Sequence, residues 1–476
     1  MIDFDKISSY SKAGPRYTSY PTAIEFHEGF GYEDLQEALL RNDKRKDLPL
    51  SLYVHLPFCK SACYFCACNV VYTNNEEKKE RYLGYLEKEL AILKTLMRTD
   101  REVVQLHFGG GTPTYFSAEQ LARVIALVRE TFPRFASDAE VSCEIDPRHF
   151  DEAQMEVLKL GGFNRVSFGV QDFDERVQKA INRFQSVELM EEVVGIARKH
   201  GIDSINFDLI YGLPFQNLTS FKETLKKAIA LSPDRFAIFN YAHVPWIKKT
   251  MGNIDEATLP KPQEKLEILK YTIEFLQASG YKMIGMDHFA KENDELYLSS
   301  QKGELRRNFQ GYTTRGFSQT IGIGLSSISE GVDYYAQNYK DLKSYESALD
   351  RGVLPLERGI ALGFDDCVRK EVIMSLMNNA RLIFEQIEMR FLIDFREYFA
   401  KELAALEVFE RDGLLELRSE GVFVNATGKM VIRNIAMSFD AYLEASATAD
   451  SMGDSARDST GDSSSRASKE RFSKTI

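Results

Sequence analysis

The chain has 476 residues, of which 44% are hydrophobic and 28% charged, a composition typical of a soluble globular protein larger than one small domain. Its formal net charge of −11 argues against nucleic-acid binding, which depends on cationic surfaces. No run approaches the roughly 18 consecutive apolar residues of a membrane span. The start MIDFDKISSY also lacks the basic and apolar regions of a signal peptide, so we expect a cytoplasmic protein with no membrane partner.

Residues 1–50 form the first predicted part of the chain. They contain GPRYTSYPTA, which is rich in turn formers and aromatic residues, and then an amphipathic helical pattern near YEDLQEALLRN. We expect this N-terminal segment to cover the substrate.

Residues 51–258 alternate short β-branched or aromatic runs with longer segments of helical period. Strands are expected at 51–58, 103–110, 139–146, 165–170, 204–212 and 234–242, and helices at 77–97, 117–132 and 186–201. Ser117 and Ser186 are predicted helix N-caps, and Gly201 is a predicted helix stop. Six successive β/α units predict an α/β fold, a partial (β/α)6 TIM-like barrel with outer helices. Because eight strands close such a barrel, six leave one side open for a large substrate.

The last two parts of the chain differ in composition. Residues 259–445 contain helical patterns such as QEKLEILKYTIEFLQAS and a hairpin-like GLLELRSEGVFVNA, so we expect a mostly helical C-terminal domain. Residues 446–476 are rich in serine and nearly lack large apolar residues, which predicts a disordered tail.

The segment HLPFCKSACYFCACNVV (55–71) holds four of the six cysteines. This cysteine-rich segment has three interpretations: buried core cysteines, a structural zinc site or an iron–sulfur cluster. A zinc site usually takes a second pair of ligands from a separate segment, whereas Cys143 and Cys367 are isolated. An iron–sulfur cluster needs closely spaced thiolates, which favours that interpretation.

Within this segment, Cys59, Cys63 and Cys66 are the predicted iron ligands. Three thiolates on a four-iron cluster leave one iron open for a non-protein ligand. Cys68 as a fourth ligand would close that iron. The alternatives for Cys68 are an inert packed thiol and a participant in the substrate chemistry, and both stay open at this point.

Polar residues and glycines recur where the predicted strands end, which is the functional edge of a β/α barrel. They are Gly109–Thr114 after the second strand, Glu144, Gln171 followed by Arg183, Asp208, and Tyr241–His243. Each alone is compatible with an ordinary turn, cap or surface residue. Their repeated position predicts a common ligand-binding rim.

The CxxxCxxC spacing resembles that of the radical S-adenosylmethionine (SAM) superfamily, in which the open iron binds the amino and carboxylate groups of SAM. Phe65, just before the third cysteine, matches a position that packs near the adenine. Five segments together resemble the oxygen-independent coproporphyrinogen III oxidases over about residues 8–443. They are SKAGPRYTSYPTA, HLPFCKSACYFCACN, HFGGGTPTY, NFQGYTT and IGIGLSSIS. The related haem-chaperone branch lacks the fourth cysteine, and NNARL (378–382) and IAMSFDAYL (435–443) depart from the resemblance by lacking cysteines.

The resemblance implies an enzyme that oxidatively decarboxylates two propionates of coproporphyrinogen III to vinyl groups, giving protoporphyrinogen IX in anaerobic haem synthesis. An electron from a donor such as flavodoxin or ferredoxin would reach a [4Fe-4S] cluster and cleave SAM to methionine and a 5′-deoxyadenosyl radical. The radical would take a hydrogen atom from the propionate β-carbon. The same resemblance implies a monomer that binds two SAM molecules.

The resemblance also implies roles for individual residues. The first SAM would contact Tyr53, Gly110, Glu144, Ala242 and Ile328, and the second would contact Phe65, Gly111, Thr112, Gln171, Arg183 and Asp208. Cys68, His55 and Glu144 are the candidate catalytic residues, although a strand histidine is also compatible with a hydrogen-bonded core position. Arg16 and Arg307 are candidates to bind substrate carboxylates, or else are solvated surface arginines.

Two rival classes remain at this point. One is another porphyrin-acting radical SAM enzyme or haem chaperone on the same scaffold. The other is a non-catalytic iron–sulfur or zinc protein.

Overall fold

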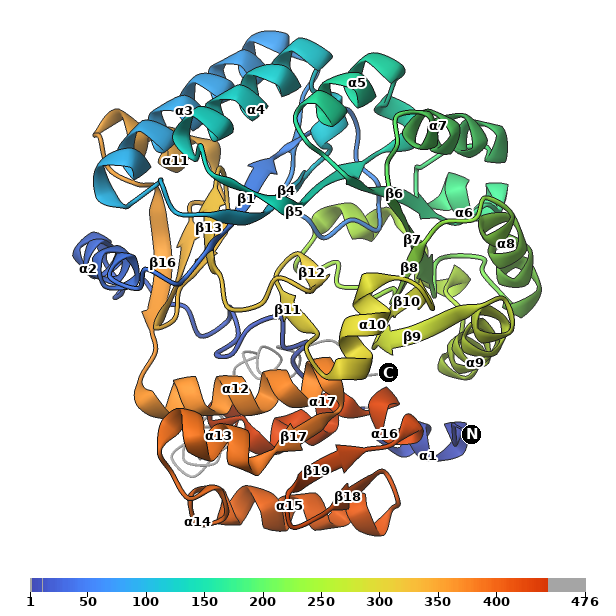
Figure 1. Cartoon of the computed structure of the whole chain (residues 1–476). Coiled ribbons are helices and arrows are strands. Elements are labelled where there is room, and N and C mark those ends of the chain that lie inside the picture. Colours follow the sequence, from blue (N-terminus) through green and yellow to red (C-terminus); the bar gives the residue numbers. More distant parts are fainter. Residues whose placement is uncertain (1, 11, 444–476) are drawn as a thin grey trace, which may run out of the picture.

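A twelve-stranded mixed sheet forms the centre of the computed structural model, which describes residues 2–10 and 12–443 (Figure 1). The strand order is β16-β15-β14-β13-β1-β4-β5-β6-β7-β8-β10-β9. The six parallel strands predicted from the sequence lie together in its middle, so this prediction is confirmed. They are β1 (Leu50–Leu56), β4 (Val103–Gly110), β5 (Phe135–Ile145), β6 (Arg165–Gln171), β7 (Ser204–Tyr211) and β8 (Arg235–Asn240). The predicted tail at 446–476 lies outside the described residues.

Helices connect these strands and cover the outside of the curved sheet (Figure 1). They are α3 (Glu76–Leu96), α4 (Ala118–Thr131), α5 (Glu152–Leu160), α6 (Glu175–Ala180), α7 (Val187–Lys199) and α8 (Leu218–Ala230). Ser117 and Ser186 cap α4 and α7 as predicted, by accepting backbone hydrogen bonds from Gln120 and Leu189. Gly201 follows α7 with a φ of +68°, a conformation that glycine adopts without steric cost. The outer apolar faces of the strands and the inner faces of these helices form the main core.

Antiparallel strands extend the sheet on both sides. β10 (His288–Lys291) and β9 (Tyr281–Gly285) continue it from β8. β13 (Gln319–Ile323) pairs parallel with β1, and β14 (Ile328–Glu330), β15 (Tyr334–Asn338) and β16 (Leu356–Ala361) follow antiparallel. Between these strands lie α9 (Pro262–Ala278), α10 (Glu295–Lys302) and α11 (Leu342–Asp350).

The predicted boundary at residue 259 therefore does not coincide with the end of the sheet. The strands between Tyr281 and Ala361 are short and mostly antiparallel, and in several of them apolar residues alternate with polar ones. Such segments become strands because they pair with the edge of a sheet. The local sequence gives little indication of that pairing, so a prediction from sequence misses it. The separate, mostly helical part of the chain begins at Phe364.

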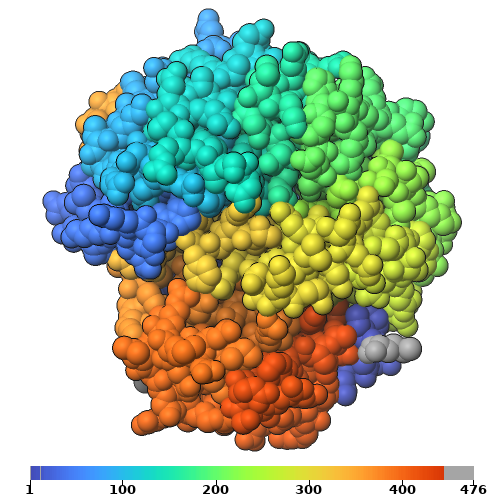
Figure 2. Space-filling model, viewed as in Figure 1, coloured from blue at the N-terminus to red at the C-terminus, as the bar shows by residue number. Residues whose placement is uncertain are grey.

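This C-terminal lobe has its own hydrophobic core and lies below the sheet in Figures 1 and 2. Its elements are α12 (Phe364–Asn379), β17 (Arg381–Ile383), α13 (Phe384–Phe391), α14 (Phe395–Tyr398), α15 (Ala400–Arg411), β18 (Leu415–Leu417), β19 (Gly421–Val424), α16 (Ala426–Met430) and α17 (Ile432–Ala436). No described helix is long and apolar enough to cross a membrane.

The N-terminal segment packs against this lobe. It contains α1 (Phe4–Ser9) and α2 (Tyr32–Asp43), and Ile7, Tyr17 and Tyr20 contribute to the lobe's core. The Tyr17 hydroxyl donates a 2.8 Å hydrogen bond to the Asp440 carboxylate. The two ends of the described chain are therefore packed together.

A two-stranded hairpin, β11 (Arg306–Asn308) and β12 (Gly311–Thr313), lies between the open side of the sheet and the C-terminal lobe (Figure 1). α12 of the lobe contacts β11. The hairpin therefore borders the space enclosed by the curved sheet.

A buried carboxyl group ties an outer helix to the strands around β13. Glu89 on α3 is only 1% exposed and accepts hydrogen bonds from the Tyr345 hydroxyl (2.6 Å), the Gly324 N–H (2.8 Å) and the Asn338 amide (2.7 Å). Burial raises the pKa of Glu89 to about 7, although all three hydrogen bonds oppose the shift. The bonds position the loop that leads from β13 to Ile328.

Replacing Glu89 with Gln should change the pH dependence of stability. The pKa of the folded state is raised above the ordinary value of 4.5, so the stabilisation from proton binding is complete below about pH 4.5 and is lost as pH rises through about 7. From pH 5 to pH 8, the unfolding free energy of the wild type relative to Glu89→Gln should fall by up to about 3 kcal/mol. Urea unfolding at both pH values measures this difference. Glu87→Gln, at an exposed position of the same helix, is the control, and an identical pH dependence in all three proteins would contradict the prediction.

Candidate active site

The cysteine-rich segment is a loop that leaves the carboxyl end of β1 and returns beside its own start. β2 (Phe58–Cys59) pairs parallel with β3 (Val71–Tyr72), so both ends of the loop are fixed. Other parts of the chain hold the middle of the loop. Tyr64 N–H donates to the Ile181 carbonyl (3.0 Å), and Lys248 Nζ donates to the Cys68 carbonyl (2.9 Å).

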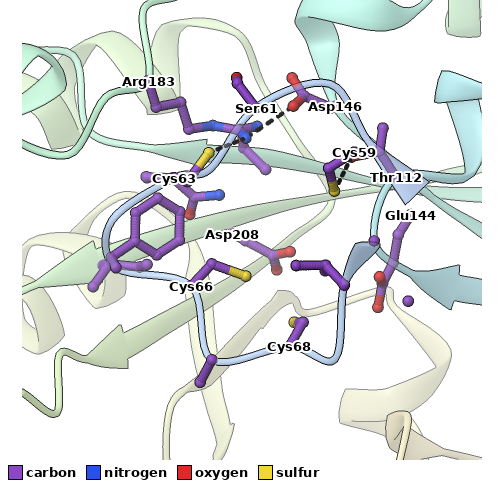
Figure 3. A pocket seen from close by; sticks show the side chains of 18 of the residues that line it. Cys59, Ser61, Cys63, Cys66, Cys68, Thr112, Glu144, Asp146, Arg183 and Asp208 are labelled. Carbon is purple, nitrogen blue, oxygen red and sulfur yellow. Dashed lines mark hydrogen bonds and ion pairs between the residues drawn. The ribbon is translucent and has the colours of Figure 1, made fainter. Parts of the chain in front are cut away.

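Cys59, Cys63 and Cys66 face a common cavity of about 500 Å³ at the carboxyl ends of the parallel strands (Figure 3). Among residues 2–10 and 12–443, no three His, Cys, Asp or Glu side chains lie close enough together to hold a single metal ion. The three thiols are therefore distributed around the cavity rather than gathered at one point.

Two arginines provide positive charge beside the loop. Arg148 and Arg183 approach the Cys63 sulfur at 3.5 and 3.7 Å, and both also bind the Asp146 carboxylate, at 2.7 and 3.0 Å. Burial alone would raise the pKa of Asp146, but the two guanidinium groups hold it well below its usual range. The two arginines therefore place positive charge beside the Cys63 sulfur.

The environments of the other thiols differ. Burial raises the pKa of Cys59 to about 12, and its sulfur lies 3.3 Å from the Thr112 hydroxyl. A hydrogen bond from the Cys68 thiol lowers the pKa of Cys66 to about 7 and raises that of Cys68. The two neighbouring thiols are thus shifted in opposite directions, with the pKa of Cys66 lowered and that of Cys68 raised.

A second cavity of about 290 Å³ adjoins the first. The residues that line both cavities are Cys68, Gly110 and Glu144. Predicted SAM contacts along the larger cavity are Phe65, Gly110, Gly111, Thr112, Glu144, Gln171, Arg183, Asp208 and Ala242. Those along the smaller one are Tyr53, Gly110, Glu144 and Ile328. The residues predicted to contact the first SAM thus line the smaller cavity, except Ala242, which lines the larger one. The residues predicted to contact the second SAM line the larger cavity.

The glycines after β4 let the backbone run close to the cavity walls. A Cβ atom at Gly111 would lie 2.6 Å from the Pro57 carbonyl oxygen, and one at Gly110 would lie 2.9 Å from the His55 ring. Gly110 also has a φ of +119°, which strains any residue with a side chain. The GGG sequence is therefore a steric requirement here and not merely a flexible turn.

Two buried carboxyl groups at the rim have opposite pKa shifts. Burial raises the pKa of Asp208 to about 7, and the nearby Glu144 charge adds to the shift. Burial would also raise the pKa of Glu144, but hydrogen bonding to His107 and the charges of its neighbours lower it overall. Glu144 is thus an anion between the cavities, while Asp208 exchanges a proton near neutral pH.

Several buried polar atoms around the larger cavity have no hydrogen-bond partner. They include Gln171 Oε1 and Arg183 Nε. Gln171 also has a φ of +66°, which is unusual for a residue other than glycine. Buried polar atoms without a partner are rare in folded proteins, so these atoms indicate a polar ligand. Three thiols, adjacent cations and unpartnered polar atoms together fit an iron–sulfur cluster with SAM.

His55 has both ring nitrogens engaged. Nδ1 lies 3.0 Å from the Tyr53 hydroxyl and Nε2 lies 3.0 Å from the Asn69 carbonyl oxygen. Burial lowers the pKa of His55 to about 4, so the ring is neutral, with Nε2 donating and Nδ1 accepting. It orients Tyr53 and anchors the cysteine loop, which matches the hydrogen-bonded core position. A catalytic role for His55 stays a prediction.

The sequence analysis missed several residues of this site. Asp146, Arg148 and Lys248 hold the cysteine loop, and Phe309 and Gln310 line the smaller cavity. Asp146 follows Glu144 within the segment CEIDP, and Phe309 and Gln310 lie within NFQGYTT, so a signal existed for these three. Arg148 and Lys248 have no local pattern that marks them.

Comparison with known proteins agrees with this geometry. Residues 53–228 match the model of the radical SAM superfamily, and residues 365–431 match the HemN C-terminal domain. Relatives described as oxygen-independent coproporphyrinogen III oxidase include one from Helicobacter pylori (strain J99), 60% identical over 93% of this chain and 97% of its own. Another, from Escherichia coli (strain K12), is 48% identical over 94% of this chain and 97% of its own. The solved structure of coproporphyrinogen III oxidase (HemN) from Escherichia coli, described as a radical SAM enzyme, matches with a TM-score of 0.88 and 47% identity. That match covers 93% of this chain and 99% of that structure.

The fold and the cysteine loop thus define a radical SAM enzyme, whose superfamily binds a [4Fe-4S] cluster and SAM. Within that class, the chain belongs to the oxygen-independent coproporphyrinogen III oxidases, which act in haem biosynthesis.

Replacing Cys59, Cys63 or Cys66 with Ser should abolish cluster binding, because each removes one thiolate ligand. Cys68→Ser should keep full iron content, because the three predicted ligands Cys59, Cys63 and Cys66 already leave the one iron that SAM requires. Iron and sulfide analysis after anaerobic reconstitution, with the buried Cys143→Ser as a control, measures this difference. Equal iron loss in Cys68→Ser and Cys63→Ser would contradict the assignment.

Proposed function

We propose that this chain converts two propionates of coproporphyrinogen III to vinyl groups with the help of two SAM molecules. The arrangement of the four thiols carries the proposal. Three of them face one cavity, while Cys68 lies at the border with a second cavity. This arrangement would leave one iron for SAM and would put the fourth thiol where a second ligand meets it.

Cys59, Cys63 and Cys66 would hold the cluster, which when bound supplies the electron that cleaves SAM to methionine and a 5′-deoxyadenosyl radical. Arg148 and Arg183 would stabilise the negative charge of the thiolates. That radical would take a hydrogen atom from the propionate β-carbon, and loss of CO2 together with transfer of one electron to an acceptor would then leave the vinyl group.

Two adjoining cavities support the binding of two SAM molecules. Asp208 in the larger cavity would bind ribose hydroxyls, and Gly111 and Thr112 would approach the methionine part closely. Tyr53, Glu144 and Ile328 would bind the other SAM in the smaller cavity. Cys68 and Glu144, which border both, would act on the reacting groups between them.

The remaining roles are also proposals. The N-terminal segment 1–50 would cover the substrate, and residues 51–258 would carry the radical chemistry. The C-terminal part within 259–445 would close the open side. An electron donor such as flavodoxin or ferredoxin would approach the cysteine loop, where Lys60 is exposed at the rim of the larger cavity. We expect the enzyme to act as a monomer.

Product analysis tests the reaction. Anaerobically reconstituted enzyme with coproporphyrinogen III, SAM and a reductant should form protoporphyrinogen IX and release two CO2 per substrate. Chromatography after oxidation to the porphyrins identifies the vinyl products. Cys63→Ser and omission of SAM are the controls. SAM cleavage without any vinyl product from the wild type would contradict the proposed function.

Equilibrium binding tests the number of SAM molecules. The wild-type holoenzyme should bind two SAM per chain. Asp208→Asn should weaken one site by roughly tenfold or more, because it removes a charge-assisted hydrogen bond, and should leave the other site intact. Asp203→Asn, at an exposed position just before β7, is the control. A single SAM per wild-type chain would refute the two-SAM proposal and leave the reaction itself untouched.

A further inference from the structure

Three arginines from distant parts of the chain meet beside the open side of the sheet. Arg16 belongs to the N-terminal segment, Arg307 to β11 and Arg433 to α17. Arg307 Nη1 donates to the Arg16 carbonyl (3.0 Å), and Arg433 donates to the Pro15 carbonyl (2.8 Å from Nε) and to the Gly14 carbonyl. We call these three residues the arginine cluster. Arg307 and Arg433 thus hold the backbone of the segment that carries Arg16.

The arginine cluster concentrates positive charge in a buried place. Arg307 is 9% exposed and Arg433 is 7% exposed. Burial lowers the pKa of Arg433 to about 10, and the charges of Arg16 and Arg307 lower it further. Asp287 forms an ion pair with Arg16 and is the carboxylate whose charge acts on both buried arginines. Three cations thus face one carboxylate, an arrangement that favours a further anion.

Buried polar atoms in Arg307 and in its neighbours lack hydrogen-bond partners. They are Arg307 Nε itself, His288 Nδ1 and the Tyr312 hydroxyl. The His288 and Tyr312 rings lie 5.0 Å apart, and the Arg307 guanidinium lies 5.3 Å from the Tyr312 ring. Donors and acceptors that are buried together without partners cost free energy unless a ligand satisfies them.

Residues next to the cluster line both cavities. The Arg16 guanidinium lies 5.8 Å over the Phe239 ring, and Phe239 lines the larger cavity and contacts His288 at 5.8 Å. Phe309 and Gln310 follow Arg307 in the hairpin and line the smaller cavity, and Gln310 Oε1 also lacks a partner. Figure 1 shows this hairpin between the sheet and the C-terminal lobe. A macrocycle lying over the two cavities would extend a side chain toward the cluster.

We propose that the arginine cluster binds a propionate carboxylate of the porphyrinogen that is not being decarboxylated, with Arg16 as the exchangeable contact and Asp287 as the group that the propionate displaces. This inference rests on the proposed function, since the substrate's four carboxylates supply the ligand. The competing explanation is that the cluster only anchors the N-terminal segment. Anchoring accounts for the contacts of Arg307 and Arg433 to backbone carbonyls. It does not account for the exposure of the Arg16 side chain, which is 38%, or for the unpartnered buried atoms.

Substitutions at Arg16 and Asp287 test the proposal because the two explanations predict different changes in the KM for coproporphyrinogen III. If a propionate binds here, Arg16→Gln should raise the KM for coproporphyrinogen III about tenfold or more, since a charge-assisted contact is lost. Asp287→Asn should lower KM or leave it unchanged, because the competing carboxylate is gone. Arg16→Lys should give an intermediate KM, since it keeps the charge without the forked geometry.

Binding of coproporphyrin III, the stable oxidised form with the same four propionates, provides a readout besides activity. Fluorescence titration of the SAM-loaded holoenzyme should show the same order of affinities among the variants. Arg81→Gln, which removes the ion pair between Arg81 on α3 and Glu346 on α11, is the control and should change neither value. Iron content and circular dichroism establish that each variant is folded and loaded.

A KM within twofold of the wild type in Arg16→Gln would overturn the proposal. A similar rise of KM in Arg16→Gln and Asp287→Asn would also overturn it and would support a purely structural ion pair. Failure of the proposed function would give a different result. The wild type would then form no vinyl product, whatever the affinities of the variants for coproporphyrin III.

Discussion

Parallel pairing of β1 with its two neighbours is the constraint on which the site depends. β1 lies between β4 and β13, with Tyr53 opposite His107 on one side and Gly322 on the other. Parallel strands end at one edge of a sheet, so this register delivers the cysteine loop, the glycines after β4 and the segment leading to Ile328 to the same place. A shift by one residue would turn His55 and Tyr53 to the helix-covered face and remove the hydrogen bond by which His55 anchors the loop.

Charge is distributed locally in a chain that is acidic overall. The formal net charge is −11, yet Arg148 and Arg183 flank the cysteine loop, and Arg16 of the arginine cluster lies over Phe239, which lines the larger cavity. Near the thiols, Asp146 compensates the cations with two ion pairs, so that region is preorganised before any ligand binds. In the arginine cluster, one carboxylate faces three cations, so compensation there is incomplete. The first arrangement suits a permanent cofactor, and the second suits an anionic ligand that enters and leaves.

The sequence predicted those features whose cause is local. The six parallel strands follow from hydrophobic runs between helical periods, and the N-caps of α4 and α7 follow from single serines. The proposed iron ligands come from cysteine spacing and the proposed SAM contacts come from the resemblance, and both stay predictions. The antiparallel strands between Tyr281 and Ala361 were missed because a strand of three to six residues depends on its partner more than on its own sequence. Arg433 and Asp287 were missed for the same reason, since each acquires its importance from residues hundreds of positions away.

The joint packing of the two ends of the chain has a consequence for biosynthesis. Tyr17 is bonded to Asp440, 423 positions later, and both Tyr17 and Tyr20 lie in the core of the C-terminal lobe. A ribosome adding about 5–20 residues per second needs roughly 20–80 seconds to make the intervening chain. During that interval the parallel strands and the cysteine loop are already synthesised, while the segment that presents Arg16 has no surface to dock on. The N-terminal segment therefore reaches its final position beside the open side of the sheet only when translation is nearly complete.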